Sequence, residues 1–370
     1  MAESPIVRAA SLLAVALFFV TTSLAQAQSS NQPQTPTPAP TAENSSPAAA
    51  AQRQQTQPLN NAPVWRDVRS GAPQVTTVRG RETNVLIQSQ GETWRSLRVP
   101  VVFGGGMIVA MAILGLGVFY MFAGQLGADD GGGQSRGRWI ERFSPIDRYA
   151  HWLLAIVWAT LAITGLILSL GKSVLLPLIG YTLFSWLAIL SKNLHNFVGP
   201  ILIVAVPLLF IRFIRDNGIG KEDVKWFVNI LGYFKGHEYP SGRFNAGEKL
   251  VFWFVLVIFS TILIITGLVL VFPNFDQTRS TMQVANVIHM VTAYIAIGLA
   301  LVHTYLGTIG LAGAYRAMRY GYVDEAWAKH HHERWYQDIV AGKSRQHFAD
   351  PKAVPREAAE ARRQASTRHA

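Results

Sequence analysis

Four histidines lie within or at the edges of long apolar stretches: His151, His195, His289 and His303. Ionisable side chains at membrane depth are costly, usually functional, and turned toward the interior of a helical bundle. His289 and His303 share one stretch and are 14 residues apart. In an α-helix that spacing is ~21 Å along the axis and ~40° off the same face. One helix face is therefore expected to carry two imidazoles at two depths.

The other two histidines match those depths if successive apolar stretches cross the membrane in alternating directions. His195 and His289 each begin a stretch running inward, whereas His151 begins one running outward. Neutral imidazole is a good axial ligand for haem iron, and bundle interiors are a common place for such sites. We expect an outer haem b held by His195 with His289, and an inner haem b held by His151 with His303. Any one of them, taken singly, could instead be a hydrogen-bonded structural histidine.

The composition agrees with a membrane protein. Half of the residues are hydrophobic and 15% are charged, against about 25% charged in soluble domains. The net charge of +11 is spread too thinly for a nucleic-acid-binding stripe and is better explained as encoding orientation in a bilayer. The absence of cysteine excludes disulfides, covalently attached haem and the ordinary ligands of iron–sulfur clusters.

The apolar stretches predict an all-α integral membrane fold. It comprises a four-helix transmembrane bundle and one extra N-terminal transmembrane helix, each stretch being long enough to span a bilayer. The extra helix is expected at 99–128, and the four bundle helices at 149–171, 193–211, 250–275 and 280–315.

The uncharged stretch 173–191 could also pass for a span. If it crossed, the basic loop after residue 211 would face outward, against the positive-inside rule. We therefore expect 173–191 to lie in the outer interface. The basic segments around the bundle then face the cytoplasm.

The regions outside the bundle have distinct compositions. Arg8, a short apolar core and Ala25-Gln26-Ala27 predict an export signal, with an uncleaved anchor as the alternative. The expected regions are a signal peptide (1–27), a disordered Pro/Gln/Ala-rich tether (28–64), a periplasmic segment (65–98), the extra helix (99–128), a cytoplasmic hinge (129–143), the four-helix domain (144–315) and a basic cytoplasmic tail (316–370).

The segment before the third bundle helix contains Asn245, Gly247 and Glu248. Asn245 and Glu248 have the spacing of a helix capping box. A quinone pocket at the inner haem is compatible with that cap. There Asn245 would donate a hydrogen bond to a quinone oxygen, Gly247 would leave room for the ring, and Glu248 or Asp147 could relay protons.

The sequence contains a short internal repeat and a histidine triplet. Ile-Thr-Gly-Leu occurs at 163–166 and again at 265–268, which could reflect duplication of a helix pair or chance. His330, His331 and His332 could bind a metal, but a solvated or partner-facing tail is the favoured interpretation. Trp327, Trp335 and Tyr336 in that tail suggest a helix docked on the inner face.

Several motifs together resemble one known family, the gamma subunit of membrane-bound formate dehydrogenase, a dihaem cytochrome b. The matching pieces lie between about residues 138 and 339: Asp147-Arg148-Tyr149-Ala150-His151-Trp152, Leu194-His195 with Gly199, Phe244-Asn245-Ala246-Gly247-Glu248-Lys249, Ile288-His289, Val302-His303 and Trp327-Ala328-Lys329-His330-His331 with Arg334-Trp335-Tyr336.

The resemblance implies that the four histidines ligate two b haems, and that Asn245 and Gly247 border a menaquinone or ubiquinone site. It also implies that formate is oxidised on a separate molybdenum or tungsten alpha subunit, with an iron–sulfur beta subunit passing electrons to the outer haem. This chain would then have no formate-oxidising site. It would anchor the complex in the bacterial inner membrane.

Two departures from the family stand out. The compact form of the family lacks everything before about residue 130, and Glu248 stands where some members have Gln. Hydrogenase and thiosulfate reductase cytochromes share the architecture, so a cytochrome b subunit of a nickel-iron hydrogenase is the first alternative. A haem-free anchor or transporter subunit is the second. The Asn-Ala-Gly segment and the Trp-Ala-Lys-His-His tail favour formate dehydrogenase.

Overall fold

The computed structural model describes residues 69–70, 91–126, 138–229, 239–275, 277–356, 358 and 360. The predicted signal peptide and tether lie outside these residues, as do 65–68 and 71–90 of the periplasmic segment, 127–128 of the extra helix and 129–137 of the hinge.

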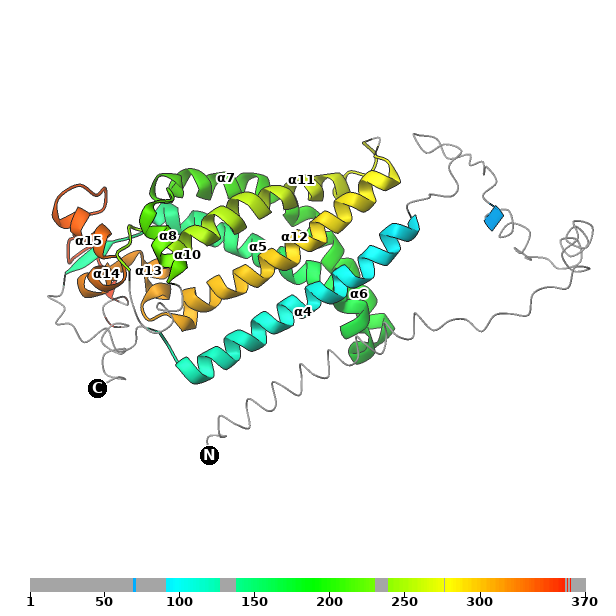
Figure 1. Ribbon diagram of the computed structural model, residues 1–370, viewed down its shortest axis with the longest axis horizontal. Coiled ribbons are helices and arrows are strands. Elements are labelled where there is room, and N and C mark those ends of the chain that lie inside the picture. The colour runs from blue at the N-terminus through cyan, green and yellow to red at the C-terminus, as the bar shows by residue number, and fades with distance from the viewer. Residues whose placement is uncertain are drawn as a thin grey trace, which may run out of the picture.

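Five long helical segments form an elongated bundle (Figure 1). The first two are α4 (Gly91–Ala123) and α5 (Pro145–Val174). The third is α6 (Leu176–Val198), which continues through η3 (Gly199–Ile201) into α7 (Leu202–Phe213) and η4 (Ile214–Asp216). The fourth consists of α10 (Ala246–Leu250), the π-helical η5 (Val251–Phe259) and α11 (Ser260–Val271), and the fifth of α12 (Arg279–Tyr305) and the π-helical η6 (Leu306–Gly310). All five are long and apolar enough to cross a membrane. The predicted all-α membrane fold, with four bundle helices and one extra N-terminal helix, is therefore confirmed.

The second bundle helix is much longer than its predicted range of 193–211. Residues 176–198 form α6, and the helix runs on to Asp216 through a tight turn at Gly199 and Pro200. The segment expected to lie separately in the interface is therefore mostly part of this helix. Gly180 interrupts it locally, with a φ of 76° that only glycine adopts readily.

The helix starts follow from capping residues. Ser144 precedes α5, where its hydroxyl accepts a hydrogen bond from the Asp147 amide and its own amide donates to the Asp147 carboxylate.

α4 begins at Gly91, earlier than the predicted residue 99. It lies alongside α12 and runs in the same direction (Figure 1).

One end of the bundle carries a small domain, and we call this the capped end and the other the open end. The domain contains β1 (Trp139–Glu141) antiparallel to β2 (Tyr322–Asp324), and the helices α13 (Ala314–Tyr320), α14 (Glu325–His331) and α15 (Glu333–Val340). α8 (Lys221–Val228) packs against α10 at the same end.

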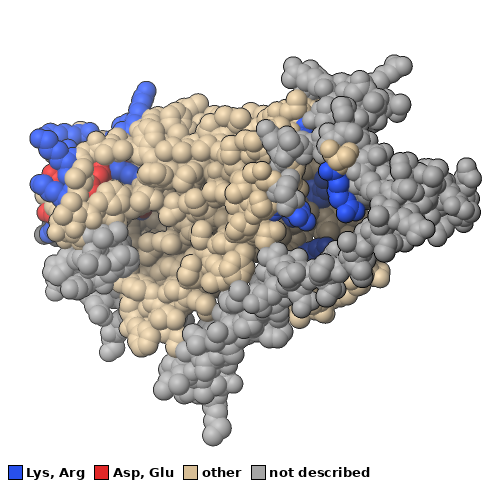
Figure 2. Space-filling model, turned by 45° about the vertical axis from the view of Figure 1, so that its right-hand side comes forward, with Lys and Arg blue, Asp and Glu red and all other residues tan. Residues whose placement is uncertain are grey.

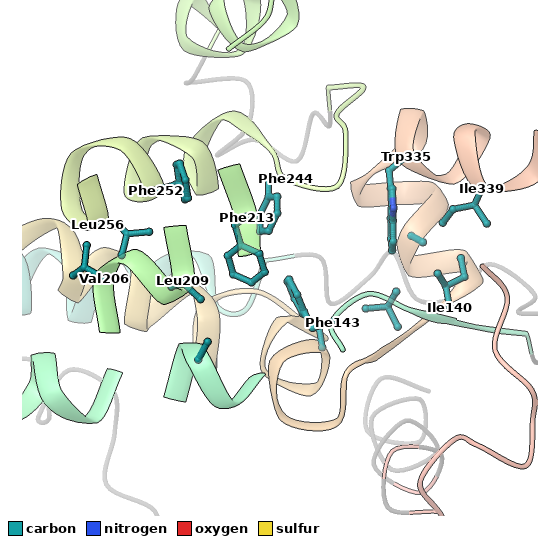
Figure 3. Close-up of a cluster of buried hydrophobic side chains, with 14 of the residues drawn as sticks. Ile140, Phe143, Val206, Leu209, Phe213, Phe244, Phe252, Leu256, Trp335 and Ile339 are labelled. Atoms are coloured by element: carbon teal, nitrogen blue, oxygen red, sulfur yellow. The ribbon is translucent and has the colours of Figure 1, made fainter. Parts of the chain in front are cut away.

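The core of the capped end joins this domain to the membrane helices. Phe143, Phe213 and Phe244 pack together, and Trp335 and Ile339 extend the cluster into α15 (Figure 3). A helix of the tail is thus docked, as predicted.

The interpretation of the histidine triplet as a solvated tail is wrong for His331 and His332. His331 and His332 are only 5% and 1% exposed. The Nδ1 atom of His332 lies 2.8 Å from the Gly242 carbonyl oxygen, so the ring is part of the domain core.

Candidate functional site: two histidine pairs and a capped loop

The first histidine pair lies toward the open end of the bundle. His195 is in the last turn of α6 and His289 is in α12, and their ring centres are 6.1 Å apart. The two side chains come from neighbouring elements that face the same cavity. The structure therefore brings together the two residues predicted for the outer haem.

Each of these rings rests on a threonine–glycine step of another helix. Thr164 Oγ1 is 2.9 Å from Nδ1 of His195, and Thr266 Oγ1 is 2.9 Å from Nδ1 of His289. A Cβ atom on Gly165 would be 3.3 Å from Cε1 of His195, and one on Gly267 would be 3.5 Å from Cε1 of His289. Each of the two Ile-Thr-Gly-Leu segments thus packs against one histidine of the first pair. This shared role favours duplication of a helix pair over a chance repeat.

The threonine contacts determine which imidazole nitrogen carries the proton. Each threonine hydroxyl lies 2.7 Å from a carbonyl oxygen one turn earlier in its helix, at Thr160 or Ile262, and can donate its single hydrogen there. A hydroxyl that donates to the carbonyl accepts the hydrogen bond from Nδ1–H of the histidine. Nε2 is left with a free lone pair, which is the state in which imidazole binds a metal.

The second pair lies toward the capped end. His151 in α5 and His303 in α12 have ring centres 6.2 Å apart. Nδ1 of His151 is buried and has no hydrogen-bond partner among the described residues. The structure thus also brings together the two residues predicted for the inner haem, but without a threonine contact.

The geometry of both pairs fits an iron between two imidazoles. A metal is about 2 Å from each ligating nitrogen, and each nitrogen is about 1 Å from its ring centre, so two axial rings have centres roughly 6 Å apart. Within the described ranges, no group of three or more His, Asp or Glu side chains is arranged to hold a metal ion. A metal at either pair would need further ligands from a macrocycle such as porphyrin.

The cavity beside the first pair has a size and a lining that suit a porphyrin. It has a volume of about 380 Å³, within the usual range for ligand pockets. Its walls include Trp158, Leu161, Leu263 and Met290, together with three glycines, Gly165, Gly199 and Gly267. An apolar wall with small residues lets a flat ring approach the helix backbone.

The predicted quinone segment forms a capping box at the start of α10. The Glu248 amide donates to Oδ1 of Asn245 at 2.9 Å, and the Asn245 amide donates to Oε2 of Glu248 at 2.9 Å. Nδ2 of Asn245 makes no hydrogen bond within the described part of the chain. The cap is therefore present, and it leaves the Asn245 amide group able to donate to a ligand. A Cβ on Gly247 would touch the indole of Trp226 at 3.4 Å.

Glu248 is held by a buried arginine. Nη2 of Arg142 lies 2.9 Å from Oε1 of Glu248, and Arg142 is only 3% exposed. Burial lowers the pKa of Arg142, and the adjacent Glu248 carboxylate opposes that shift. Burial, together with the Arg142 charge, lowers the pKa of His332 to about 3, so His332 is neutral in the folded protein.

Asp147, the second residue considered for proton relay, is enclosed in ion pairs. Its carboxylate accepts from Arg212 at 2.7 Å and from Arg243 at 3.1 Å, besides capping α5. This geometry favours a structural role for Asp147.

Sequence reasoning missed the two threonines as contributors to the site. The signal was available, because the repeated Thr-Gly steps precede both histidines of the first pair by comparable distances along the chain.

A helical membrane bundle with two facing histidine pairs defines a class, the membrane-bound b-type cytochromes. The family model described as prokaryotic cytochrome b561 matches residues 142–321. The cytochrome b556(Fdn) subunit of the nitrate-inducible formate dehydrogenase of Escherichia coli K12 is 30% identical over 223 residues, covering 57% of this chain and 96% of the relative.

Two other relatives agree. The cytochrome b556(fdo) subunit of formate dehydrogenase from Escherichia coli K12 is 31% identical over 209 residues, which are 54% of this chain and 93% of that protein. The cytochrome b556 subunit of formate dehydrogenase from Haemophilus influenzae is 27% identical over 207 residues, with 53% and 82% coverage. The chain belongs to the family of formate dehydrogenase cytochrome b subunits.

Proposed function

We propose that this chain is the electron-transferring membrane subunit of a formate:quinone oxidoreductase. Electrons arrive from an iron–sulfur beta subunit, pass through two b haems and reduce menaquinone or ubiquinone. The observation that carries the proposal is the pair of imidazole–imidazole separations, 6.1 and 6.2 Å, at two depths of α12 in a chain of this family.

The histidines would hold the two haems, His195 with His289 and His151 with His303. Bound haem supplies an iron that alternates between ferric and ferrous states and so carries one electron at a time. The chain's own contribution is to keep Nε2 of His195 and His289 deprotonated, and to exclude water with apolar helix faces.

The quinone is assigned to the capped end. Asn245 would donate its Nδ2 hydrogen to a quinone oxygen near Gly247, where the absence of a side chain lets the Trp226 indole pack closely. Glu248 would pass protons to the reduced quinone, because it lies in the same capping box as Asn245. Arg142 would keep that carboxylate in place.

The capped end is proposed to face the cytoplasm. It carries Arg142, Arg212, Arg243 and the basic tail, as the positive-inside rule requires. The iron–sulfur subunit would then dock at the open end, with the molybdenum or tungsten alpha subunit beyond it. This chain anchors the complex and has no formate-oxidising site. The predicted signal peptide is part of the same proposal.

The test uses membranes that contain the whole complex. Formate should reduce the haems, whereas hydrogen should not, and added quinone should reoxidise them. Replacing Asn245 with Ala should leave reduction by formate intact and slow reoxidation about tenfold, as expected for one lost hydrogen bond to a ligand. Reduction by hydrogen alone would instead assign the chain to a hydrogenase. The absence of any b-type signal would leave only a haem-free anchor.

A further inference from the structure

The extra N-terminal helix α4 forms part of the first histidine cavity. Its residue Arg98 lines that cavity, together with Lys192 of α6 and Asn286 of α12. The match to the cytochrome b561 family begins at residue 142, so Arg98 belongs to a segment outside it.

The depth of Arg98 follows from the way α4 packs on α12. The ring of Tyr294 lies against Gly105, where a Cβ atom would be only 2.0 Å from it, and Ile108 lies against Gly298. Arg98 precedes Gly105 by about 10 Å of helix, and His289 precedes Tyr294 by about 8 Å. Since the two helices run in the same direction, Arg98 lies level with His289 or slightly nearer the open end.

The charges around this cavity are unbalanced. Arg98 and Lys192 are the only charged residues among those that line it, and none is acidic. Arg98 stacks on Trp94 at 5.8 Å, and neither cation forms an ion pair with any described residue. Figure 2 shows basic side chains bordering a hollow at this end of the molecule.

A third polar group in the cavity also lacks a partner. Oδ1 of Asn286 is buried and makes no hydrogen bond to any part of the chain that the structure describes. Asn286 is three residues before His289 and therefore lies on nearly the same face of α12. Two cations and one amide thus surround a cavity that offers them no protein carboxylate.

We propose that Arg98 and Lys192 bind the propionate carboxylates of the outer haem, so that α4 is an added clamp on that haem. The Nδ2 group of Asn286 would donate a further hydrogen bond. Haem has two carboxylates on one edge, and guanidinium and ammonium groups pair with carboxylates in charge-assisted hydrogen bonds. The inference rests on the proposed function, because it requires a haem between His195 and His289.

The test compares Arg98→Gln, Lys192→Gln and the double variant with the conservative Arg98→Lys. Lys172→Gln is the matched control, because Lys172 is an exposed cation at the same end that does not line the cavity. A cation near the propionates favours the ferrous haem, which has one positive charge fewer. Each Gln variant should therefore lower the midpoint potential of the outer haem in a spectroscopic redox titration, whereas Arg98→Lys and the control should leave it close to wild type.

A second measurement is haem retention by the purified full-length protein. The Arg98→Gln variant should lose the outer haem about tenfold faster, as expected for one charge-assisted bond, while the inner haem stays bound. Reconstitution with haem dimethyl ester, which has no free carboxylates, should remove the difference between wild type and variant. Unchanged potential and retention in the double variant would overturn the clamp but leave the proposed function standing. A wild-type protein without an outer haem would instead overturn the proposed function.

Discussion

At the scale of single residues, the outer histidines are set apart from the inner ones by their hydrogen bonds. Thr164 and Thr266 accept from Nδ1 of His195 and His289, whereas Nδ1 of His151 has no partner within the described segments. An acceptor at Nδ1 makes the imidazole a stronger electron donor to iron. The two proposed haem sites should therefore differ in their redox properties, even though the ring separations of the two histidine pairs are alike.

Replacing Thr266 with Val tests this difference. The change keeps the side-chain shape but removes the oxygen that orients His289, so binding of the outer haem should weaken about 10- to 100-fold. The midpoint potential of that haem should rise, because a weaker donor stabilises ferric iron less. Redox titration and haem retention of the purified protein measure both effects.

Thr160→Val is the control, since the Thr160 hydroxyl donates to the carbonyl of Ile156 and forms no hydrogen bond to a histidine among the described residues. Equal behaviour of the two variants would contradict the role of Thr266.

His332 gives a pH prediction at the same scale. Its pKa is about 3 in the folded protein, against about 6.5 when unfolded. The unfolded state therefore binds more protons between these values, and stability should fall as the pH is lowered from about 6.5 toward 3. The slope should approach roughly 1.4 kcal/mol per pH unit.

Unfolding of the capped end, followed by tryptophan fluorescence at a series of pH values, measures this slope. His332→Asn should flatten it, because Asn does not titrate. Parallel curves for wild type and variant would show that His332 does not dominate the acid response.

At the scale of elements, the sequence predicted the positions of the membrane helices better than their ends. Hydropathy averaged over some twenty residues locates a span, and the depth of a residue in a straight helix follows from its distance to the helix end. That is why the four histidines can be paired from the sequence. The start of the second bundle helix at Leu176 was missed, because the positive-inside rule shows which side a loop faces but not how far a helix extends into the interface. The burial of His332 was missed because it depends on contacts with residues far away in the chain, such as Gly242.

The packing of α4 on α12 depends on one glycine. A Cβ atom at Gly105 would collide with the ring of Tyr294, whereas one at Gly104 would meet nothing within 4 Å. Gly105→Leu should therefore push α4 away from α12, and Gly104→Leu should not.

The natural chain has no cysteine, which makes the test direct. A short bifunctional cross-linker between Val109→Cys and Ile297→Cys, two positions in one buried cluster, should react several-fold less in the Gly105→Leu background than in the Gly104→Leu background. Equal yields would show that α4 does not need this contact.

At the scale of the whole molecule, the bundle separates two tasks. The open end holds a histidine pair in an apolar cavity with unpaired cations at its edge. The capped end holds a second pair beside the half-buried Glu248 and the buried Arg142 and His332. A small domain there joins the C-terminal helices to the membrane helices. The proposed function assigns electron entry to the open end and proton-coupled quinone reduction to the capped end.

The most direct measurement is the amount of haem b per polypeptide in the purified full-length protein, determined from its pyridine haemochrome spectrum. We predict two haems per chain in the wild type, and one each in His289→Ala and His303→Ala, with the outer haem missing from the first variant and the inner haem from the second. A wild-type ratio of one or zero, or two haems retained in either variant, would contradict the assignment of these histidine pairs.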